Sequence, residues 1–421
     1  MVKINSYFAQ IQDEFVYIYD KAHFMFKKVG PGVLIAAGFI GPGTVTACTL
    51  AGVGFGYALL WAMVLSIFAT VVLQEMAARL GIITQKGLAD VIKSELKHPI
   101  ARIGVIGIIL GAIVIGNAAY EGGNIGGATL GMEALFGVKG TPYYPFIIGG
   151  LAFVLLFIGN YKLLEKVFIG LVILMSLSFI ITAIITRPDI VAILQDVFIA
   201  RIPDESILTV IALVGTTVVP YNLFLHASLV SEKWKSRDDL KLARRDTYVA
   251  IILGGMVSMA IIIAAAAIPE GEVKTVMDMA KGLEPLYGDA AKYFMGIGLF
   301  AAGVTSSITA PLAAAYVANS CFGWKASLTD LKFKMVWMLI LLLGVLFMGF
   351  DIKPIEIIKF AQIANGILLP LIAVFLLWIV NKTAVMGKYK NSVLQNVIGI
   401  VIILLALLLG VKSILKVLGM F

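Results

Sequence analysis

Charged residues are scarce in this chain. Only 14% of the 421 residues are Asp, Glu, Lys or Arg, whereas 60% are hydrophobic, and the mean hydropathy is +1.00. These values lie far outside the range of soluble domains and indicate an integral membrane protein. The two cysteines, Cys48 and Cys321, have a spacing that fits neither a disulfide framework nor a metal site. We therefore expect both to be small apolar packing residues.

The sequence also lacks the signatures of an enzyme. No nucleophile lies in a pattern with a base, and the glycine pairs at 122–123 and 126–127 follow no strand that would make them a phosphate-binding loop. We therefore expect no catalytic residue and no cofactor. No basic face with interleaved aromatic residues is present either, so we do not expect nucleic acid as a partner.

Long apolar runs make up most of what the sequence does contain. A helix needs about 20 apolar residues to cross a bilayer, and we predict an all-α fold with eleven such spans. The predicted spans are 31–56, 58–80, 101–121, 143–159, 166–186, 206–230, 247–268, 288–318, 335–350, 354–380 and 392–419. Residues 1–30 are polar and mixed in charge, so we expect a cytoplasmic N-terminal segment there and no cleavable signal peptide.

The loop charges predict the orientation of these spans. Loops after even-numbered spans are basic, whereas loops after odd-numbered spans hold few cations and several carboxylates. The first basic loop, after span two, carries Lys86, Lys93, Lys97 and Arg102. The positive-inside rule then places the N-terminus in the cytoplasm, and eleven spans place the C-terminus outside. We therefore attribute the net charge of +8 to cations in the cytoplasmic loops, which orient the chain in the lipid bilayer of the cell membrane.

Two short helix-breaking segments interrupt apolar spans, at 41–44 (GPGT) and 219–222 (VPYN). Proline removes a backbone donor and glycine adds backbone freedom, so we expect both helices to unwind there. Non-helical backbone at membrane depth survives only where it is buried in protein or lines a wet cavity, and paired broken helices mark transporter substrate sites. Two ordinary proline kinks are the alternative interpretation.

The spacing of the two breaks predicts an internal repeat. They lie about five spans apart, and because five is odd, the two units have opposite orientations in the bilayer. This predicts a 5+5 inverted repeat of the LeuT type with broken helices 1 and 6. The expected boundaries are 31–203 and 204–384 for the two five-helix repeats and 385–421 for an eleventh helix outside them.

Several motifs give the chain a family resemblance. Span two contains 74–81 (QEMAARLG), and span six contains 220–226 (PYNLFLH). The segment 283–286 (LEPL) precedes span eight, and 368–370 (LLP) lies in span ten. Over nearly its whole length the chain resembles the Nramp family of divalent-metal transporters. The resemblance implies a LeuT-type fold and uptake of manganese or iron, commonly coupled to protons.

The metal-binding positions that this resemblance implies are altered. Family members read Asp-Pro-Gly-Asn in span one, where this chain has Gly41 and Thr44 in place of the two ligands. In span six family members read Met-Pro-His-Asn, and this chain has Val219 in place of the methionine and Tyr221 in place of the histidine. The residue that offers a carbonyl one turn earlier in the family matches Thr216. A divalent cation leaving water needs charged or multiple oxygen ligands. Of the residues present, only Thr44 and Thr216 remain as candidate metal contacts.

We expect a substrate site near the bilayer midplane, between spans one and six. Gln362 matches a family glutamine that approaches the substrate, and Asn365 lies one turn further along span ten, where large polar groups are costly to leave unsatisfied. The predicted substrate-binding residues are Gly41, Gly43, Thr44, Thr216, Val219, Tyr221, Asn222, Gln362 and Asn365. A wet, substrate-sized cavity is expected beside the two breaks.

Proton coupling, which the resemblance implies, is expected to be weak. Of the family's acid pair in span three only Glu121 remains, with Ala118 at its partner's position, and span nine lacks arginine. A carboxylate inside a membrane is often functional, so Glu121 is a candidate for the coupling path, with a structural hydrogen bond as the alternative. His226 is a second candidate with the same alternative. Glu75 and Arg79, four residues apart, predict an intrahelical ion pair.

These features predict a multi-pass secondary transporter that works by alternating access. By resemblance its substrate is a divalent metal ion, and the altered site favours a hydrated cation such as magnesium over manganese or iron. One alternative is a carrier of a small organic solute such as an amino acid, for which unwound helices supply amide donors and carbonyls. Another is a non-transporting receptor on the same scaffold. The sequence leaves the coupling ion, the direction of transport and the oligomeric state open.

Overall fold

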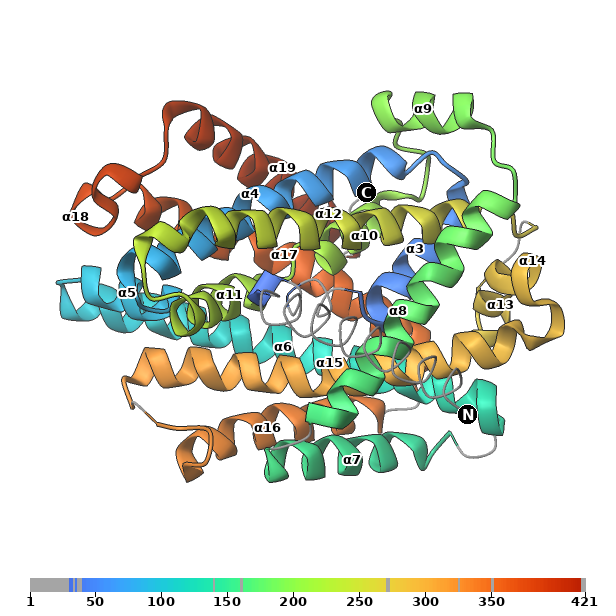
Figure 1. Cartoon of the computed structure of the whole chain (residues 1–421), viewed down its shortest axis with the longest axis horizontal. Helices are drawn as coiled ribbons and strands as arrows, with labels where there is room; N and C mark the ends of the chain where they lie inside the picture. The colour runs from blue at the N-terminus through green and yellow to red at the C-terminus, as the bar shows by residue number, and fades with distance from the viewer. Residues whose placement is uncertain are drawn as a thin grey trace, which may run out of the picture.

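The fold is helical in every part of the chain that the structure describes. The structure is a computed structural model that describes residues 30–32, 35, 40–138, 141–159, 162–269, 273–324, 326–349 and 352–417. The described residues contain no strand. Most of the long helices run along the long axis of the molecule, with α5 and α18 near one end and α9, α13 and α14 near the other (Figure 1).

The helix boundaries follow the predicted spans closely. The helices are α3 (Pro42–Phe55), α4 (Leu60–Thr84), α5 (Leu88–Glu95), α6 (Pro99–Phe136), α7 (Tyr144–Ile158), α8 (Lys162–Ile185), α9 (Ile190–Phe198), α10 (Ile207–Thr217), α11 (Pro220–Lys233), α12 (Leu240–Ala265), α13 (Val276–Ala280), α14 (Glu284–Tyr287), α15 (Ala291–Phe322), α16 (Leu331–Met348), α17 (Pro354–Val380), α18 (Thr383–Met386) and α19 (Val393–Val417). The expected N-terminal segment 1–30 lies, apart from residue 30, outside the described residues.

The count of eleven spans stays a prediction. Within the described ranges, nine helices are long and apolar enough to cross a membrane, and α7 is a shorter apolar helix. The first half of span one is described only at residues 31, 32, 35 and 40. The boundaries of the two repeats and the orientation in the bilayer likewise remain predictions.

The predicted boundary that differs most from the structure is the end of span three. Span three was expected to end near residue 121, but α6 continues to Phe136 through its glycine-rich second half. The glycines there allow neighbouring helices to pack closely against α6. A Cβ at Gly127 would overlap Pro42 at the start of α3, and a Cβ at Gly131 would lie 2.6 Å from the carbonyl oxygen of Gly296 on α15. Close packing therefore compensates the low helix propensity of glycine.

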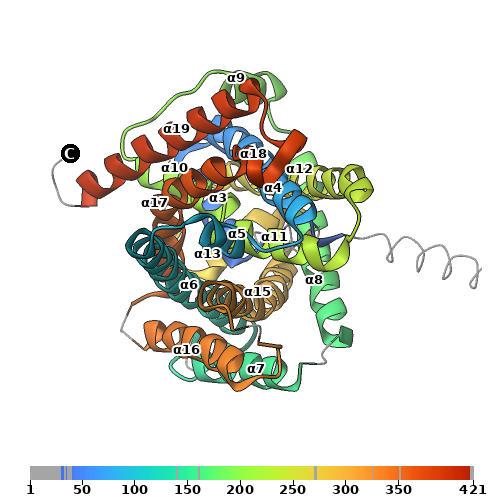
Figure 2. The same cartoon turned by 90° about the vertical axis from the view of Figure 1, so that its left-hand side faces the viewer.

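The buried apolar residues form two clusters towards opposite ends of the molecule. One cluster includes Leu73 and Leu376, near the end that carries α5 and α18. The other includes Val45 and Leu299, towards the end that carries α13. Figure 2, which looks along the bundle from the α5 and α18 end, shows α7 and α16 at one edge and α19 at the opposite edge. Many apolar side chains on these three helices are exposed, which is the pattern of a surface that faces lipid.

Candidate functional site

Both predicted breaks are present, and each lies just before its proline. Residues 31, 32 and 35 are helical, Ile40 and Gly41 are not, and α3 begins at Pro42. In span six α10 ends at Thr217, the backbone is non-helical at Val218 and Val219, and α11 begins at Pro220. A proline at the first helical position costs no hydrogen bond, because a backbone N–H at that position has no partner within the helix. Each half-helix therefore starts with a proline.

The two broken helices meet at a pair of threonines. The hydroxyls of Thr44 and Thr216, 172 residues apart in sequence, are hydrogen-bonded at 2.7 Å. Gly43 is helical, in the first turn of α3, and a Cβ there would overlap the side-chain amide of Gln362 on α17. A Cβ at Gly215 on α10 would likewise overlap the backbone carbonyl of Gln362. Close backbone approach thus joins α3, α10 and α17 around these side chains.

Several buried polar atoms around this junction lack hydrogen-bond partners. They are the Tyr221 hydroxyl, both amide atoms of Asn222, Oε1 of Gln362 and Nδ2 of Asn365. All four side chains are at most 2% exposed. An unpaired buried polar group costs about 1–3 kcal/mol, so such groups are few in native proteins and usually have a ligand or water as partner. Their concentration beside the breaks marks this region as the candidate site.

The remaining predicted residues frame the junction through backbone or ring contacts. Gly41 and Val219 are the extended residues that precede the two half-helices. The ring of Tyr221 packs edge-on against Tyr120 of α6, with ring centroids 5.4 Å apart and an interplanar angle of 72°. Asn365 faces Gly116 of α6, since a Cβ at Gly116 would lie 3.7 Å from its Oδ1. The predicted set therefore comes together on α3, α10, α11 and α17 with α6 behind it.

The residues of this junction are closed off from solvent. Thr44 and Thr216 are fully buried, and the wet cavity expected beside them stays a prediction. A polar cavity of about 490 Å³ lies instead at the far end of α11, between the α4–α5 turn, α15 and the start of α16. We call this cavity, lined among others by Asp90, Ser228 and Glu232, the α11 vestibule. The helix α11 connects the candidate site at Pro220 to the vestibule at Glu232.

The oxygen donors of the candidate site are neutral. In the ranges that the structure describes, no group of three or more His, Cys, Asp and Glu side chains could hold a metal ion. The donors available are the hydroxyls of Thr44, Thr216 and Tyr221 and the amide oxygens of Asn222 and Gln362. Such groups can accept hydrogen bonds from a hydrated cation more readily than they can replace its whole water shell.

Glu121 lies on α6, completely buried. Its Oε2 accepts a hydrogen bond from Asn124 at 3.2 Å, and its Oε1 has no partner. Gly344 of α16 packs against it, so that a Cβ there would lie 2.9 Å from the Cβ of Glu121. Among the described residues no cation forms an ion pair with this carboxyl. Span nine corresponds to α16, and the α16 residue that packs against Glu121 is Gly344 and not an arginine.

His226 lies on α11 among polar partners from two other helices. Its Nδ1 is 2.8 Å from Oε1 of Gln74 on α4, and its Nε2 is 3.4 Å from the hydroxyl of Thr247 on α12. Both ring nitrogens therefore have a partner, which favours the structural alternative for this histidine. Its place in a coupling path stays a prediction.

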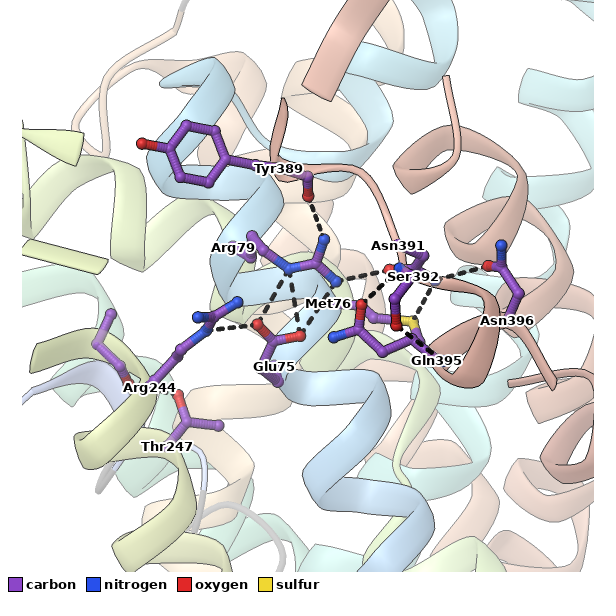
Figure 3. Close-up of polar contacts among 11 residues, drawn as sticks. Glu75, Met76, Arg79, Arg244, Thr247, Tyr389, Asn391, Ser392, Gln395 and Asn396 are labelled. Carbon is purple, nitrogen blue, oxygen red and sulfur yellow. Dashed lines mark hydrogen bonds and ion pairs between the residues drawn. The ribbon is translucent and has the colours of Figure 1, made fainter. Parts of the chain in front are cut away.

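The ion pair predicted on α4 is confirmed and belongs to a larger network (Figure 3). Arg79 Nε lies 3.0 Å from Glu75, and Arg244 of α12 adds a second ion pair to the same carboxylate at 2.8 Å. Arg79 also donates to Asn391 at 2.6 Å and to the carbonyl oxygen of Tyr389. The sequence offered no signal for Arg244, which is 169 residues from Glu75. This network ties α4 to α12 and to the segment between α18 and α19.

The hydroxyl cluster on α15 divides into two kinds. Thr305 and Thr309 donate to carbonyls one turn earlier in their own helix, at 2.8 and 3.1 Å. Ser306 and Ser307 are buried and have no hydrogen-bond partner. Ser306 and Ser307 therefore add to the unpaired polar atoms in the described part of the chain.

Comparisons with known proteins cover nearly the whole chain. A family model described as natural resistance-associated macrophage protein-like (Nramp) matches residues 32–416. The chain is similar to a protein named divalent metal cation transporter MntH from Verminephrobacter eiseniae, with 28% identity over 90% of this chain and 86% of that protein. A second protein of that name, from Yersinia enterocolitica, is 27% identical over 90% of this chain and 92% of its own length.

Solved structures agree on the fold. The chain is similar to a manganese transporter from Eremococcus coleocola, with a TM-score of 0.75 and 20% identity over 93% of this chain and 87% of that one. The chain also aligns with Mhp1, described as a nucleobase-cation-symport-1 family transporter, at a TM-score of 0.55, and with MhsT in complex with L-phenylalanine at a TM-score of 0.57. The LeuT-type helical fold predicted from the two breaks is therefore confirmed.

Proposed function

Since the chain belongs to the Nramp family of multi-pass membrane transporters, we propose that it carries divalent metal cations across a membrane by alternating access. The support is the match over most of the chain, together with relatives that are named divalent metal cation transporters. The broken helices add a physical reason, because their unwound residues expose backbone groups at the point where two repeats would meet. The substrate site is the junction around Thr44, Thr216 and Gln362.

The preferred substrate is a cation that keeps part of its water shell, such as magnesium. The observation that carries this proposal is the set of neutral, unpaired oxygens and amides at Tyr221, Asn222 and Gln362. Mg²⁺ dehydrates reluctantly and usually retains several waters, whereas the bare transition metals are held by carboxylates, imidazoles or thioethers. Gly41 and Val219 supply no such ligand. Water molecules on the ion would satisfy the unpaired groups.

The α11 vestibule is the proposed path between this site and the cytoplasm. Its two carboxylates, Asp90 and Glu232, lie at the end of the helix that starts at the break. Lys86 also lines the vestibule, so the two carboxylates leave a net negative charge of one, which favours a departing cation. The path follows the predicted orientation, in which the α4–α5 loop and the N-terminus are cytoplasmic and the C-terminus is outside.

Binding and flux of two metals test the proposal together. Purified protein in proteoliposomes should carry Mg²⁺, reported by an internal magnesium dye, while calorimetry finds Mn²⁺ binding weak or absent. The triple variant Gly41→Asp, Thr44→Asn, Val219→Met should gain Mn²⁺ affinity. Low-micromolar Mn²⁺ affinity of the unchanged protein would contradict the neutral-oxygen site. No flux of any divalent cation, with a melting temperature raised only by amino acids, would favour the organic-solute carrier.

Cysteine labelling tests the orientation separately. Both native cysteines are buried, so their background labelling is low. Exposed positions Asp204 and Lys388 lie in loops predicted to face opposite sides. In right-side-out vesicles an impermeant maleimide should label Asp204→Cys and spare Lys388→Cys. The reverse pattern would invert the proposed path.

A further inference from the structure

A cavity lined by cations lies beside the α11 vestibule. It has a volume of about 390 Å³ and lies between α5, the first turns of α6 and the C-terminal end of α15, at the end of the bundle that faces the viewer in Figure 2. Lys86, Lys93 and Arg102 line this cavity, and we call the cavity the basic pocket. Its other lining residues include Asp90 and Ser320, which it shares with the vestibule.

Three cations and one carboxylate line the basic pocket, so the protein leaves a net positive charge there. Among the described residues, none of its three cations forms an ion pair, and the nearby Asp90 carboxylate accepts a hydrogen bond from Ser320 at 2.8 Å. Lys93 lies at the C-terminal cap of α15, since a Cβ at Gly323 would be 2.8 Å from its ammonium nitrogen. The partial negative charge of that helix end accounts for one cation at most. The pocket can therefore accept an anion.

The pocket opens at an apolar edge of the molecule. Arg102 lies between Ile100 and Ile103, whose side chains are 76% and 72% exposed. Further along the same helix, Ile108 and Ile115 are 47% and 66% exposed. Exposed isoleucines on a membrane-crossing helix face lipid chains. The basic pocket thus lies where the headgroup layer meets the acyl layer.

We propose that the basic pocket binds the phosphate headgroup of an anionic phospholipid, with an acyl chain lying along the exposed isoleucines of α6. A phosphodiester supplies the missing negative charge and several oxygen acceptors for lysine and arginine donors. The isoleucine edge selects a lipid over free phosphate, because only a lipid has a chain to cover it.

Lipid-dependent stability of the purified chain tests this proposal. Delipidated protein in detergent should gain melting temperature with phosphatidylglycerol and much less with phosphatidylcholine. The variant Lys86→Gln, Lys93→Gln, Arg102→Gln should lose the preference, with phosphatidylglycerol affinity falling about fivefold per charge removed. The matched control Lys241→Gln, Lys388→Gln, Lys390→Gln removes three exposed cations that do not line the cavity and should keep the preference.

Further arms make the outcome decisive. The charge-preserving variant Lys86→Arg, Lys93→Arg should retain the phosphatidylglycerol effect, which separates loss of charge from loss of fold. If the triple glutamine variant does not fold, Arg102→Gln alone, at the exposed lipid edge, should lower the affinity by about fivefold. Equal stabilisation by inorganic phosphate without lipid would overturn the lipid assignment. An unchanged phosphatidylglycerol preference in the glutamine variants, or an equal loss in the control variant, would overturn the pocket itself.

Discussion

At the scale of single residues, the candidate site depends on small side chains in close contact. The hydroxyls of Thr44 and Thr216 are hydrogen-bonded to each other, at the positions where the family pattern has an asparagine and a carbonyl donor. Gly43 allows α17 to bring Gln362 against the first turn of α3. Neither contact involves a charged side chain. The empty site therefore contains no unpaired charge, and the loaded site can hold a hydrated cation or a neutral substrate.

Thr44→Val should weaken substrate binding modestly. Valine keeps the shape of threonine and removes one hydroxyl, which costs about 1 kcal/mol, or about fivefold in affinity. Thr182→Val on α8 is the matched control, because Thr182 is equally buried and its hydroxyl donates to the carbonyl oxygen of Ser178 in its own helix. Calorimetry on both variants measures the difference. Equal weakening by the two changes would argue against a role for the Thr44 hydroxyl.

Gly43→Trp should abolish transport and leave the fold intact enough for purification. The indole would occupy the space of the Gln362 amide, at the closest approach of α3 and α17. Gly54→Trp is the control on the same helix, since no atom lies within 4 Å of a Cβ at Gly54. Flux into proteoliposomes separates the two variants. Normal flux through well-folded Gly43→Trp protein would place the substrate elsewhere.

At the scale of helices, polar contacts hold the ends of the half-helices and of α4 in place. The amides of Gly30 and Gly32, at the start of span one, donate to the carboxylate of Asp246 on α12 at 2.8 and 2.7 Å. On α4, Glu75 and Arg79 link α12 to the segment between α18 and α19 (Figure 3). These contacts join helices that are far apart in sequence at one end of the bundle.

Removing Glu75 should cost more stability than removing Arg244. Glu75→Gln leaves Arg79, which is only 2% exposed, without a counter-charge, and an unpaired buried charge costs about 3–5 kcal/mol. Arg244→Gln removes a side chain that is 37% exposed, and a pair of that kind contributes about 1 kcal/mol or less. Melting temperatures in detergent rank the two variants. A larger loss in Arg244→Gln would show that Arg79 is already satisfied by Asn391 and Tyr389.

At the scale of the whole molecule, the candidate site lies where two apolar clusters meet. Val219 and Tyr221 at the second break belong to the cluster that contains Leu73, whereas Val45 at the start of α3 belongs to the other cluster. Packed apolar residues resist deformation, whereas unpaired polar groups between helices are a suitable place for a substrate and for rearrangement. This arrangement suits alternating access around a central site.

Transport should be only weakly driven by protons. Glu121 packs against Gly344 and has no cationic partner within the described residues, and both nitrogens of His226 are already bonded. An internal pH dye in proteoliposomes should report little acidification during substrate uptake, and Glu121→Gln should keep most of the flux. Strong acidification that disappears in Glu121→Gln would instead make this carboxyl the proton carrier.

Some features of the site could be predicted and others could not. The breaks followed from Pro42 and Pro220, because the effect of proline on a helix is local. The end of α6 could not be predicted, since the helical state of its glycines depends on contacts with Pro42 and Gly296. The bond between Thr44 and Thr216 was also unforeseen, although both residues were in the predicted site. Arg244 gave no signal, because nothing near it in sequence identifies Glu75 as its partner.

The sequence by itself predicted the long apolar helices, the two breaks and residues such as Thr44 and Thr216 that meet beside them. Hydropathy, helix breaking and loop charge are properties of short segments, so they can be evaluated without knowing the neighbours in space. Only the tertiary structure decided which side chains meet. It pairs Thr44 with Thr216, sets Gly344 against Glu121 and adds Arg244 to the pair on α4. Such pairings are set by how helices more than a hundred residues apart in sequence pack, and local patterns carry no record of that packing.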